Sequence, residues 1–181
     1  AELCGERPDP QWSAVAAGLR IPHFADGTTR EHAGYDGEMI KQADANLLGY
    51  PLGIVTGREA QLRDLEYYER RIDPRNGPAM SYSVFAIQYA RLGMAEKACE
   101  MFRRSYLPNL RPPFGVFAET ATSGNPYFMT GAGGMLQAVL FGFGGLEITA
   151  DGLVQRPSVL PPQWKNLRIK INGKIYQATN Q

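Results

Sequence analysis

Glu119 is the residue of this sequence whose type and surroundings best suit acid–base chemistry. The apolar run from Phe114 to Ala118 precedes it, and a polar loop from Ser123 to Pro126 follows. A carboxylate on a loop beside aromatic side chains is a candidate general base or general acid, because burial tunes its affinity for a proton. A glutamate that simply lies on the surface is the alternative, and the residue pattern alone does not separate the two.

Lys41 and Gln42 are a second candidate, in a polar run that ends at Asp44 and opens a predicted helix. A lysine donates hydrogen bonds and a glutamine both donates and accepts them, so the pair could hold a ligand rich in hydroxyl groups. A solvated first turn of the helix explains the same residues, and composition alone favours that alternative.

The glycine-rich run at residues 131–134 follows Thr130 and permits a very close approach of backbone or ligand. It lacks the strand and glycine loop that define a phosphate-binding motif. Close helix packing is therefore the favoured interpretation.

Metal and nucleophile chemistry have no support in the sequence. His23 and His32 have no partner at a spacing typical of metal ligands, and Cys4 and Cys99 lie far apart, as expected of two ordinary thiols. No G-x-S-x-G pattern places a nucleophilic serine. We therefore expect neither a metal nor another cofactor.

The elements that must position these residues are mainly helices. Asp9 followed by Pro10 is a typical helix opening, and apolar side chains recur at helical spacing in about five further stretches. The expected helices cover Pro10 to Leu19, Met39 to Gly49, Thr56 to Ile72, Pro78 to Leu92, Ala95 to Tyr106, and Phe128 to Phe141. Nearly all-apolar helices alternate with helices that have one polar side.

After Gly145 the pattern changes to short alternating runs separated by Asp151-Gly152 and Asn172-Gly173, which are strong hairpin signals. The predicted fold is therefore mainly α, with a terminal β segment too small to form a complete sheet. Inner and outer helices in alternation are typical of half a double-layered helical toroid, and a simple helical bundle is the alternative.

The charge pattern limits the partners. The 181 residues include 19 basic and 18 acidic ones, a net charge of +1, without a block of like charge that would follow a phosphate backbone. The most apolar stretch, Met135 to Leu146, is interrupted by glycines and is too short to cross a bilayer. We expect neither nucleic acid nor membrane as a partner. The chain begins with Ala1 in a loop-like run, which suggests a piece of a longer polypeptide.

Several motifs of this chain, in the same order, resemble glycoside hydrolase family 65. They are Ile40-Lys-Gln-Ala-Asp44, Leu48-Gly-Tyr-Pro51, Gly77-Pro-Ala-Met-Ser81, Phe117-Ala-Glu119, Thr130-Gly-Ala-Gly-Gly134, Gln137-Ala-Val139 and Phe141-Gly142. The resemblance covers nearly the whole chain and is strongest to hydrolytic members, the acid trehalases and the glucosidase that acts on glucosyl-galactosyl-hydroxylysine.

This resemblance implies an (α/α)6 barrel followed by a small β domain. Residues 1–145 would be the C-terminal part of the catalytic barrel, and residues 146–181 would be the β-rich C-terminal segment. Lys41 and Gln42 would contact the glucose whose bond is cut, and Glu119 would be the general base that activates water.

Family members invert the anomeric centre, so a second carboxyl group, roughly 6.5–9.5 Å from the base, must protonate the leaving oxygen from the other side. In the family it lies further upstream of the lysine–glutamine motif than this chain extends. Asp36 and Glu38 look like helix-start residues instead. The expected partners are thus an α-glucoside substrate and the upstream part of the same polypeptide.

Two alternatives stay open. A family 65 disaccharide phosphorylase would need a phosphate site where Glu119 stands, and the charge of Glu119 would repel phosphate. The chain could also be a non-catalytic carbohydrate-binding piece that retains Lys41 and Gln42.

Overall fold

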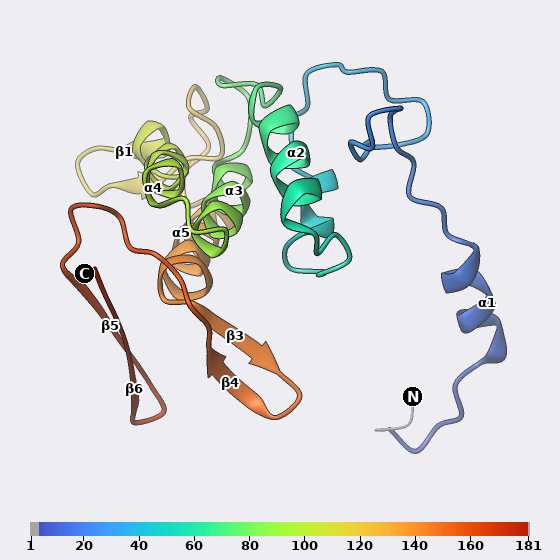
Figure 1. The fold of residues 1–181 in the computed structure, drawn as a ribbon. Coiled ribbons are helices and arrows are strands. Elements are labelled where there is room, and N and C mark those ends of the chain that lie inside the picture. Colours follow the sequence, from blue (N-terminus) through green and yellow to red (C-terminus); the bar gives the residue numbers. More distant parts are fainter. Residues whose placement is uncertain (1–3, 181) are drawn as a thin grey trace. The chain divides into compact units, whose positions relative to one another are not determined.

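The computed structural model of this chain describes residues 4–180 (Figure 1). The chain divides into two units, Ala1–Asp36 and Gly37–Gln181, and each is described by itself. Helices dominate, and the strands form three separate two-stranded antiparallel pairs. The predicted mainly α class is therefore confirmed. The helical barrel and the domain boundary after residue 145 stay predictions.

In the first unit, helix α1 (Pro10–Gly18) opens as predicted. The Asp9 carboxylate accepts a hydrogen bond of 2.8 Å from the Gln11 amide, and Pro10 occupies the first helical position. None of the helix's residues is buried in this structure, and Trp12 is 58% exposed. A loop follows, in which His23 and Thr29 form an isolated antiparallel bridge.

The predicted helix from Met39 to Gly49 is wrong. Ile40 instead forms a parallel bridge with Ile72, in which its amide donates to the Arg71 carbonyl at 2.8 Å and its carbonyl accepts from the Asp73 amide at 3.1 Å. These long-range bonds hold the backbone extended, so its groups cannot bond within their own turn. Only one short 3₁₀ turn, η2 (Ala45–Leu48), forms in this stretch.

Three helices follow, α2 (Arg58–Glu69), α3 (Ala79–Arg91) and α4 (Ala95–Arg104). Most side chains of α3 are buried, whereas α2 and α4 bury one face each. The predicted alternation of buried and half-exposed helices is confirmed here. Helix α3 packs between α4 and α5 and forms the centre of this unit (Figure 1).

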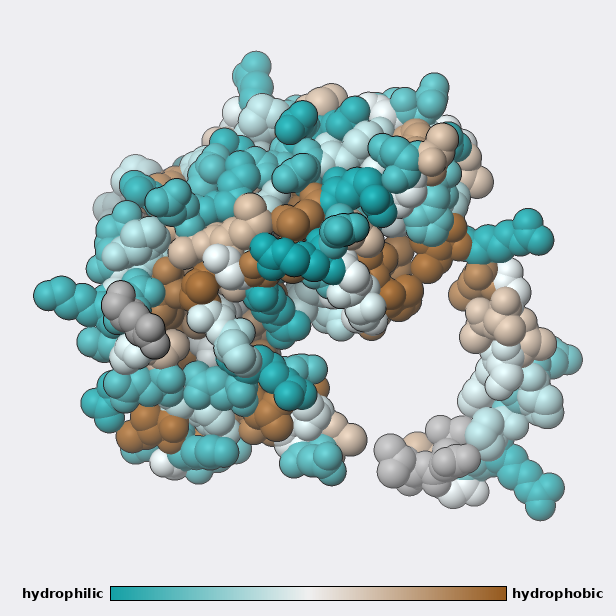
Figure 2. Space-filling model, viewed as in Figure 1, coloured by the Kyte–Doolittle hydropathy of each residue, from teal (hydrophilic) through white to brown (hydrophobic). Residues whose placement is uncertain are grey.

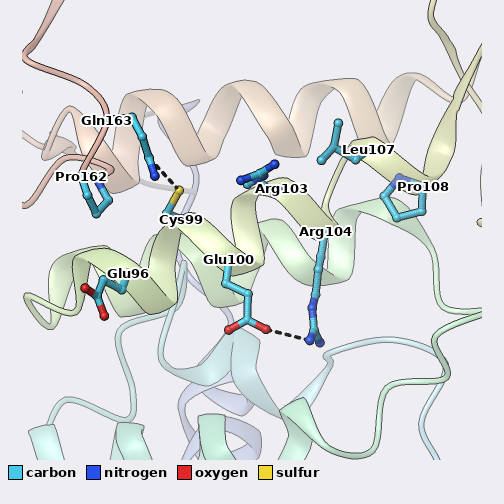
Figure 3. A pocket seen from close by; sticks show the side chains of 9 residues that line it. All are labelled: Glu96, Cys99, Glu100, Arg103, Arg104, Leu107, Pro108, Pro162 and Gln163. Atoms are coloured by element: carbon cyan, nitrogen blue, oxygen red, sulfur yellow. Dashed lines mark hydrogen bonds and ion pairs between the residues drawn. The ribbon is translucent and has the colours of Figure 1, made fainter.

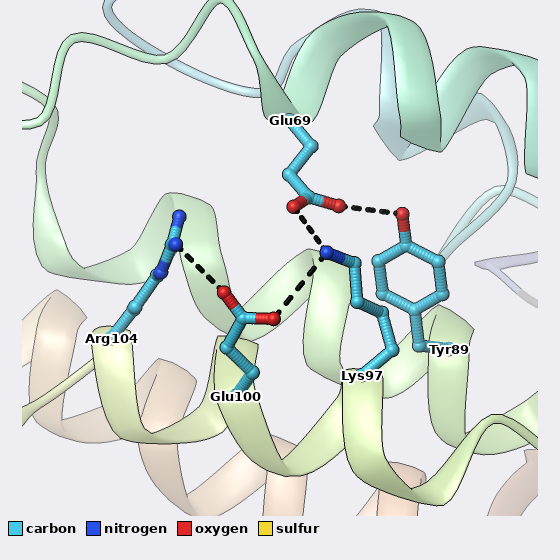
Figure 4. A network of polar contacts seen from close by, with 5 residues as sticks. All are labelled: Glu69, Tyr89, Lys97, Glu100 and Arg104. Atoms are coloured by element: carbon cyan, nitrogen blue, oxygen red, sulfur yellow. Dashed lines mark hydrogen bonds and ion pairs between the residues drawn. The ribbon is translucent and has the colours of Figure 1, made fainter.

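A polar network joins α2, α3 and α4 (Figure 4). Glu69 accepts hydrogen bonds from the Tyr89 hydroxyl at 2.8 Å and from the Lys97 ammonium at 2.6 Å. Glu100 pairs with Lys97 and also with Arg104. Burial, and then the Glu69 carboxylate, raise the pKa of Tyr89 well above its usual range, so the phenol stays a donor. The network orients the three helices without placing an unpaired charge between them.

Helix α5 (Met129–Gln137) packs against α3 through glycines. A Cβ atom at Gly131 would lie 2.8 Å from the Ala79 Cβ, and one at Gly134 would lie 2.5 Å from the Ser83 Oγ. The packing interpretation is therefore confirmed at these two positions.

The predicted helix from Phe128 to Phe141 does not stay α-helical. Its second half is the π-helix η4 (Ala138–Phe143), where a Cβ atom on Gly142 would lie 3.1 Å from the Ile87 Cα. The wider turn keeps glycines against α3 further along the chain. Sequence periodicity gave no signal for this change of helix type.

Both predicted hairpins form. β3 (Leu146–Thr149) pairs with β4 (Gly152–Gln155), and β5 (Asn166–Ile171) pairs with β6 (Lys174–Thr179). Asn172 and Gly173 have positive φ angles of 48° and 82°, as a tight hairpin turn requires. An edge-to-face aromatic cluster packs this segment on the helices, and its members are Phe102, Phe143 and Trp164.

Candidate functional site

The structure brings two of the predicted site residues together. The Lys41 ammonium lies 3.7 Å from the Glu119 carboxylate, and their side chains are 63% and 33% exposed. An exposed ion pair of this length contributes little to stability. The two groups therefore stand at the surface where a ligand can reach both, and Gln42 lies exposed beside Lys41.

One turn of the chain anchors both residues. It begins at Ile72, which forms a bridge with Ile40, the residue before Lys41. It ends at Ala79, whose amide donates a hydrogen bond of 3.0 Å to the Glu119 carbonyl. The spacing between the two polar groups is thus set by a single short segment ahead of α3. Residues far apart in the sequence become neighbours through it.

Asp73 shapes that turn. Its carboxylate accepts hydrogen bonds from the Asn76 side chain at 2.8 Å and from the Arg75 amide at 2.9 Å. The bond from the Asn76 side chain, followed by the bonds from the backbone amides, holds the pKa of Asp73 below its ordinary value. At Gly77, a Cβ atom would lie 2.6 Å from the Asp73 carbonyl oxygen, so the turn closes only on glycine.

A buried asparagine holds the backbone of Glu119. Asn109 ends the 3₁₀ turn η3 (Leu107–Asn109) and is 3% exposed. Its side-chain nitrogen donates to the backbone carbonyls of Ala118 and Glu119, both at 3.1 Å. Its backbone carbonyl accepts a hydrogen bond of 2.8 Å from the Ala118 amide. Glu119 therefore sits on a fixed backbone even though its side chain is partly solvated.

A two-stranded ribbon, β1 (Leu110–Arg111) with β2 (Val116–Phe117), leads into Glu119. The Arg111 guanidinium reaches past this ribbon to the loop after Glu119. It donates to the carbonyls of Thr120, Ala121 and Ser123 at 3.0, 2.8 and 3.1 Å. The loop that carries the candidate base is therefore tied on both sides.

Two other motifs singled out in the sequence, residues 48–51 and 137–139, also contact each other. The Tyr50 hydroxyl donates to the Gln137 side chain at 3.5 Å, and the Arg91 guanidinium lies 4.7 Å from the Tyr50 ring centroid. Burial raises the pKa of the Tyr50 phenol, and the nearby Arg91 charge partly opposes this. The contact connects the segment after η2 to the end of α5.

Asp36 and Glu38 lie in a loop rather than at a helix start, because the helix expected after them does not form. Between residues 4 and 180, no three His, Cys, Asp or Glu side chains are arranged to hold a metal ion. Over the same residues, no helix is long and apolar enough to cross a membrane.

A surface hollow of about 570 Å³ lies elsewhere, along α4 and the segment before β5 (Figure 3). Glu100, Arg103 and Gln163 line part of it, and the Cys99 thiol lies 3.7 Å from the Gln163 side-chain oxygen. Neither Lys41 nor Glu119 borders it. The hollow is therefore separate from the Lys41–Glu119 pair.

Sequence reasoning missed Asp73, Asn109 and Arg111. Each acts on backbone groups across a turn or a ribbon, and the loop-like run around Arg111 gives no periodic signal. The only available signal was Asp73 followed by Pro74, Asn76 and Gly77, a combination typical of a tight turn.

Proteins with similar sequences are, by name, hydrolases, glucosidases and trehalases. The chain is 48% identical over 169 residues to the kojibiose hydrolase of Mucilaginibacter mallensis, covering 93% of this chain and 25% of that protein. It is 39% identical over 173 residues to a protein-glucosylgalactosylhydroxylysine glucosidase of Danio rerio, covering 93% and 26%. A periplasmic/secreted acid trehalase of Candida glabrata is 36% identical over 161 residues, covering 81% and 13%.

The chain thus spans about a quarter of the length of the first two relatives. A solved structure assigned as a kojibiose phosphorylase from the human microbiome matches with a TM-score of 0.53 and 22% identity, covering 77% of this chain and 20% of that one. This likeness supports the fold alone. No family model matches the chain.

Proposed function

We propose that this chain supplies the general base and part of the glucose-binding surface of an inverting α-glucoside hydrolase of glycoside hydrolase family 65. The observation that carries the proposal is the 3.7 Å approach of Lys41 to Glu119, because these two residues come from separate motifs of that family. The hydrolase and glucosidase names of the relatives support the same reaction class.

In this mechanism Glu119 takes a proton from a water molecule as the water attacks the anomeric carbon. The bond from that carbon to the leaving oxygen breaks at the same step, and a second carboxylic acid protonates the departing oxygen. That acid belongs to the upstream polypeptide, outside residues 1–181. Lys41 and Gln42 donate hydrogen bonds to hydroxyl groups of the reacting glucose.

Glu119 also favours hydrolysis over phosphorolysis. A carboxylate in the position of the nucleophile's activator attracts a proton of water and repels a phosphate dianion. The proposed activity therefore releases glucose, rather than glucose 1-phosphate, and its rate is independent of added phosphate.

A small nucleophile tests the role of Glu119. In Glu119→Ala, water lacks its base and hydrolysis should fall by about 10²–10⁴-fold. Azide needs no base, so it should attack the anomeric carbon from the same face and yield β-glucosyl azide while the general acid still protonates the leaving group. Glu66→Ala, on the exposed side of α2, is the matched control and should hydrolyse normally. If Glu119→Ala hydrolyses the substrate at the normal rate, Glu119 is not the base.

A further inference from the structure

Arg111 makes an unusual set of contacts for an arginine. Within residues 4–180 its hydrogen bonds go to five backbone carbonyl oxygens, those of Pro108, Leu110, Thr120, Ala121 and Ser123. Carbonyl groups do not neutralise a guanidinium charge. They do match its fixed fork of donors, which can hold several acceptors in one geometry.

The bonded carbonyls lie on both sides of Glu119. Two of them belong to residues that precede β2, and the other three follow Glu119 directly in the loop from Thr120 to Ser123. The guanidinium therefore closes the loop onto the ribbon that leads into it. A further bond, from the Ser123 amide to the Thr120 hydroxyl at 3.0 Å, tightens the same loop.

We infer that Arg111 is a positioning residue for catalysis, because it fixes the loop behind Glu119 and so aims the carboxylate at the attacking water. The inference rests on the proposed role of Glu119 as general base. Asn109 holds the Glu119 carbonyl from the other side, so two side chains share the task. Neither has to touch the substrate.

The size of the effect follows from the geometry of proton transfer. The base must lie within hydrogen-bond reach of the water, and a displacement of about 1 Å costs on the order of 10²-fold in rate. Loss of Arg111 frees three carbonyls of the loop at once. We expect Arg111→Ala to lower kcat for hydrolysis by about 10–10²-fold with a smaller change in KM.

The azide reaction separates positioning from a general structural role. In Glu119→Ala the group that Arg111 positions is absent. Adding Arg111→Ala to that variant should therefore leave β-glucosyl azide formation unchanged within about twofold. Arg156→Ala, which removes an arginine paired with Glu147 on the β3–β4 hairpin, is the matched control and should leave both reactions unchanged.

The experiment uses this chain joined to its upstream polypeptide, with azide and an α-linked glucose disaccharide. Arg111→Lys serves beside Arg111→Ala, because it keeps the charge but loses the fork and should also slow hydrolysis. If Arg111→Ala lowers azide turnover and hydrolysis by the same factor, or if both Arg111 variants hydrolyse normally, the positioning inference is overturned while Glu119 keeps its role. If Glu119→Ala forms no azide product, the general base and this inference fail together.

Discussion

The carboxylate of Glu119 is partly solvated, but the backbone carbonyl of Glu119 accepts hydrogen bonds from Asn109 and from the first turn of α3. Removing its negative charge without changing its size should therefore spare the fold. We expect Glu119→Gln to abolish hydrolysis, because an amide cannot accept the proton of water, while the unfolding midpoint stays near that of the parent. The measurements are glucose release and thermal unfolding of both proteins. Turnover at the parent rate would remove Glu119 from the mechanism.

Lys41 is largely exposed and has little to contribute to stability. If it binds a hydroxyl group of the reacting sugar, that bond should strengthen as the ring flattens toward the transition state. Lys41→Ala should then raise KM and lower kcat together. Lys170→Ala, at an exposed position of β5, is the matched control. Kinetic constants equal to those of the control would mean that Lys41 only solvates its loop.

The charge of Asp73 makes the stability of the turn ahead of α3 depend on pH. Its pKa in the folded chain is below the ordinary value of 3.8, so its contribution to stability is present above that value and is lost as pH falls through the lower, folded pKa. Asp73→Asn should therefore be less stable near neutral pH and should lose less stability on acidification. Thermal unfolding at neutral pH and below the ordinary pKa checks this. Parallel losses in both proteins would contradict it.

At the scale of elements, α5 and α3 approach through specific glycines. A Cβ atom on Gly131 would lie 2.8 Å from the Ala79 Cβ and 3.2 Å from a ring carbon of Phe117. Gly131→Ala should therefore destabilise the chain by about 1–3 kcal/mol through overpacking.

Gly133 provides the control within the same helix. Nothing lies within 4 Å of a Cβ atom at this position, and the residue is exposed. Gly133→Ala should stabilise the helix by about 0.5–1 kcal/mol, because alanine has the higher helix propensity. Denaturant unfolding of both variants should show a lower free energy of unfolding for Gly131→Ala and a higher one for Gly133→Ala. Equal effects at the two positions would contradict the packing seen here.

The predictable elements are those whose signals are local. Asp9 with Pro10 sets the start of α1, and Asn172 with Gly173 sets the turn between β5 and β6, so the sequence predicts both correctly. The error at Met39 to Gly49 has a long-range cause, because Ile40 bonds to residues beside Ile72. The candidate site shows the same division. The types of Lys41 and Glu119 could be identified in the sequence, but their approach depends on backbone contacts that no spacing reveals.

At the scale of the whole molecule, the proposed mechanism needs a second carboxyl group from upstream. Residues 1–181 alone should release no glucose from α-linked disaccharides, because general acid catalysis typically contributes about 10²–10⁴-fold. Addition or fusion of the upstream polypeptide should restore activity. Full activity of the isolated chain would contradict the missing acid.

Exposed apolar side chains on the second unit lead us to expect that residues 1–181 self-associate. Apolar side chains reach the surface (Figure 2), and Tyr127, Met129 and Leu136, in and before α5, are 75%, 78% and 56% exposed. Exposed apolar surface of this kind favours association. Light scattering of residues 1–181 should show self-association, and a clean monomer would argue against a missing helical neighbour.

The π-helix at Ala138–Phe143 has a consequence for how this gene can change. A π-turn holds one residue more than an α-turn, so the loss of a single codon here would let an ordinary α-helix form without a break. The shortened turn would still complete one rotation of the helix, so the residues after it would leave in the same direction as before. Gly144, where a Cβ atom would lie 2.5 Å from the Ile169 Cδ1, would then keep its place against β5. We expect the loss of one residue to be tolerated at this turn, as insertions and deletions are at the hairpin tips.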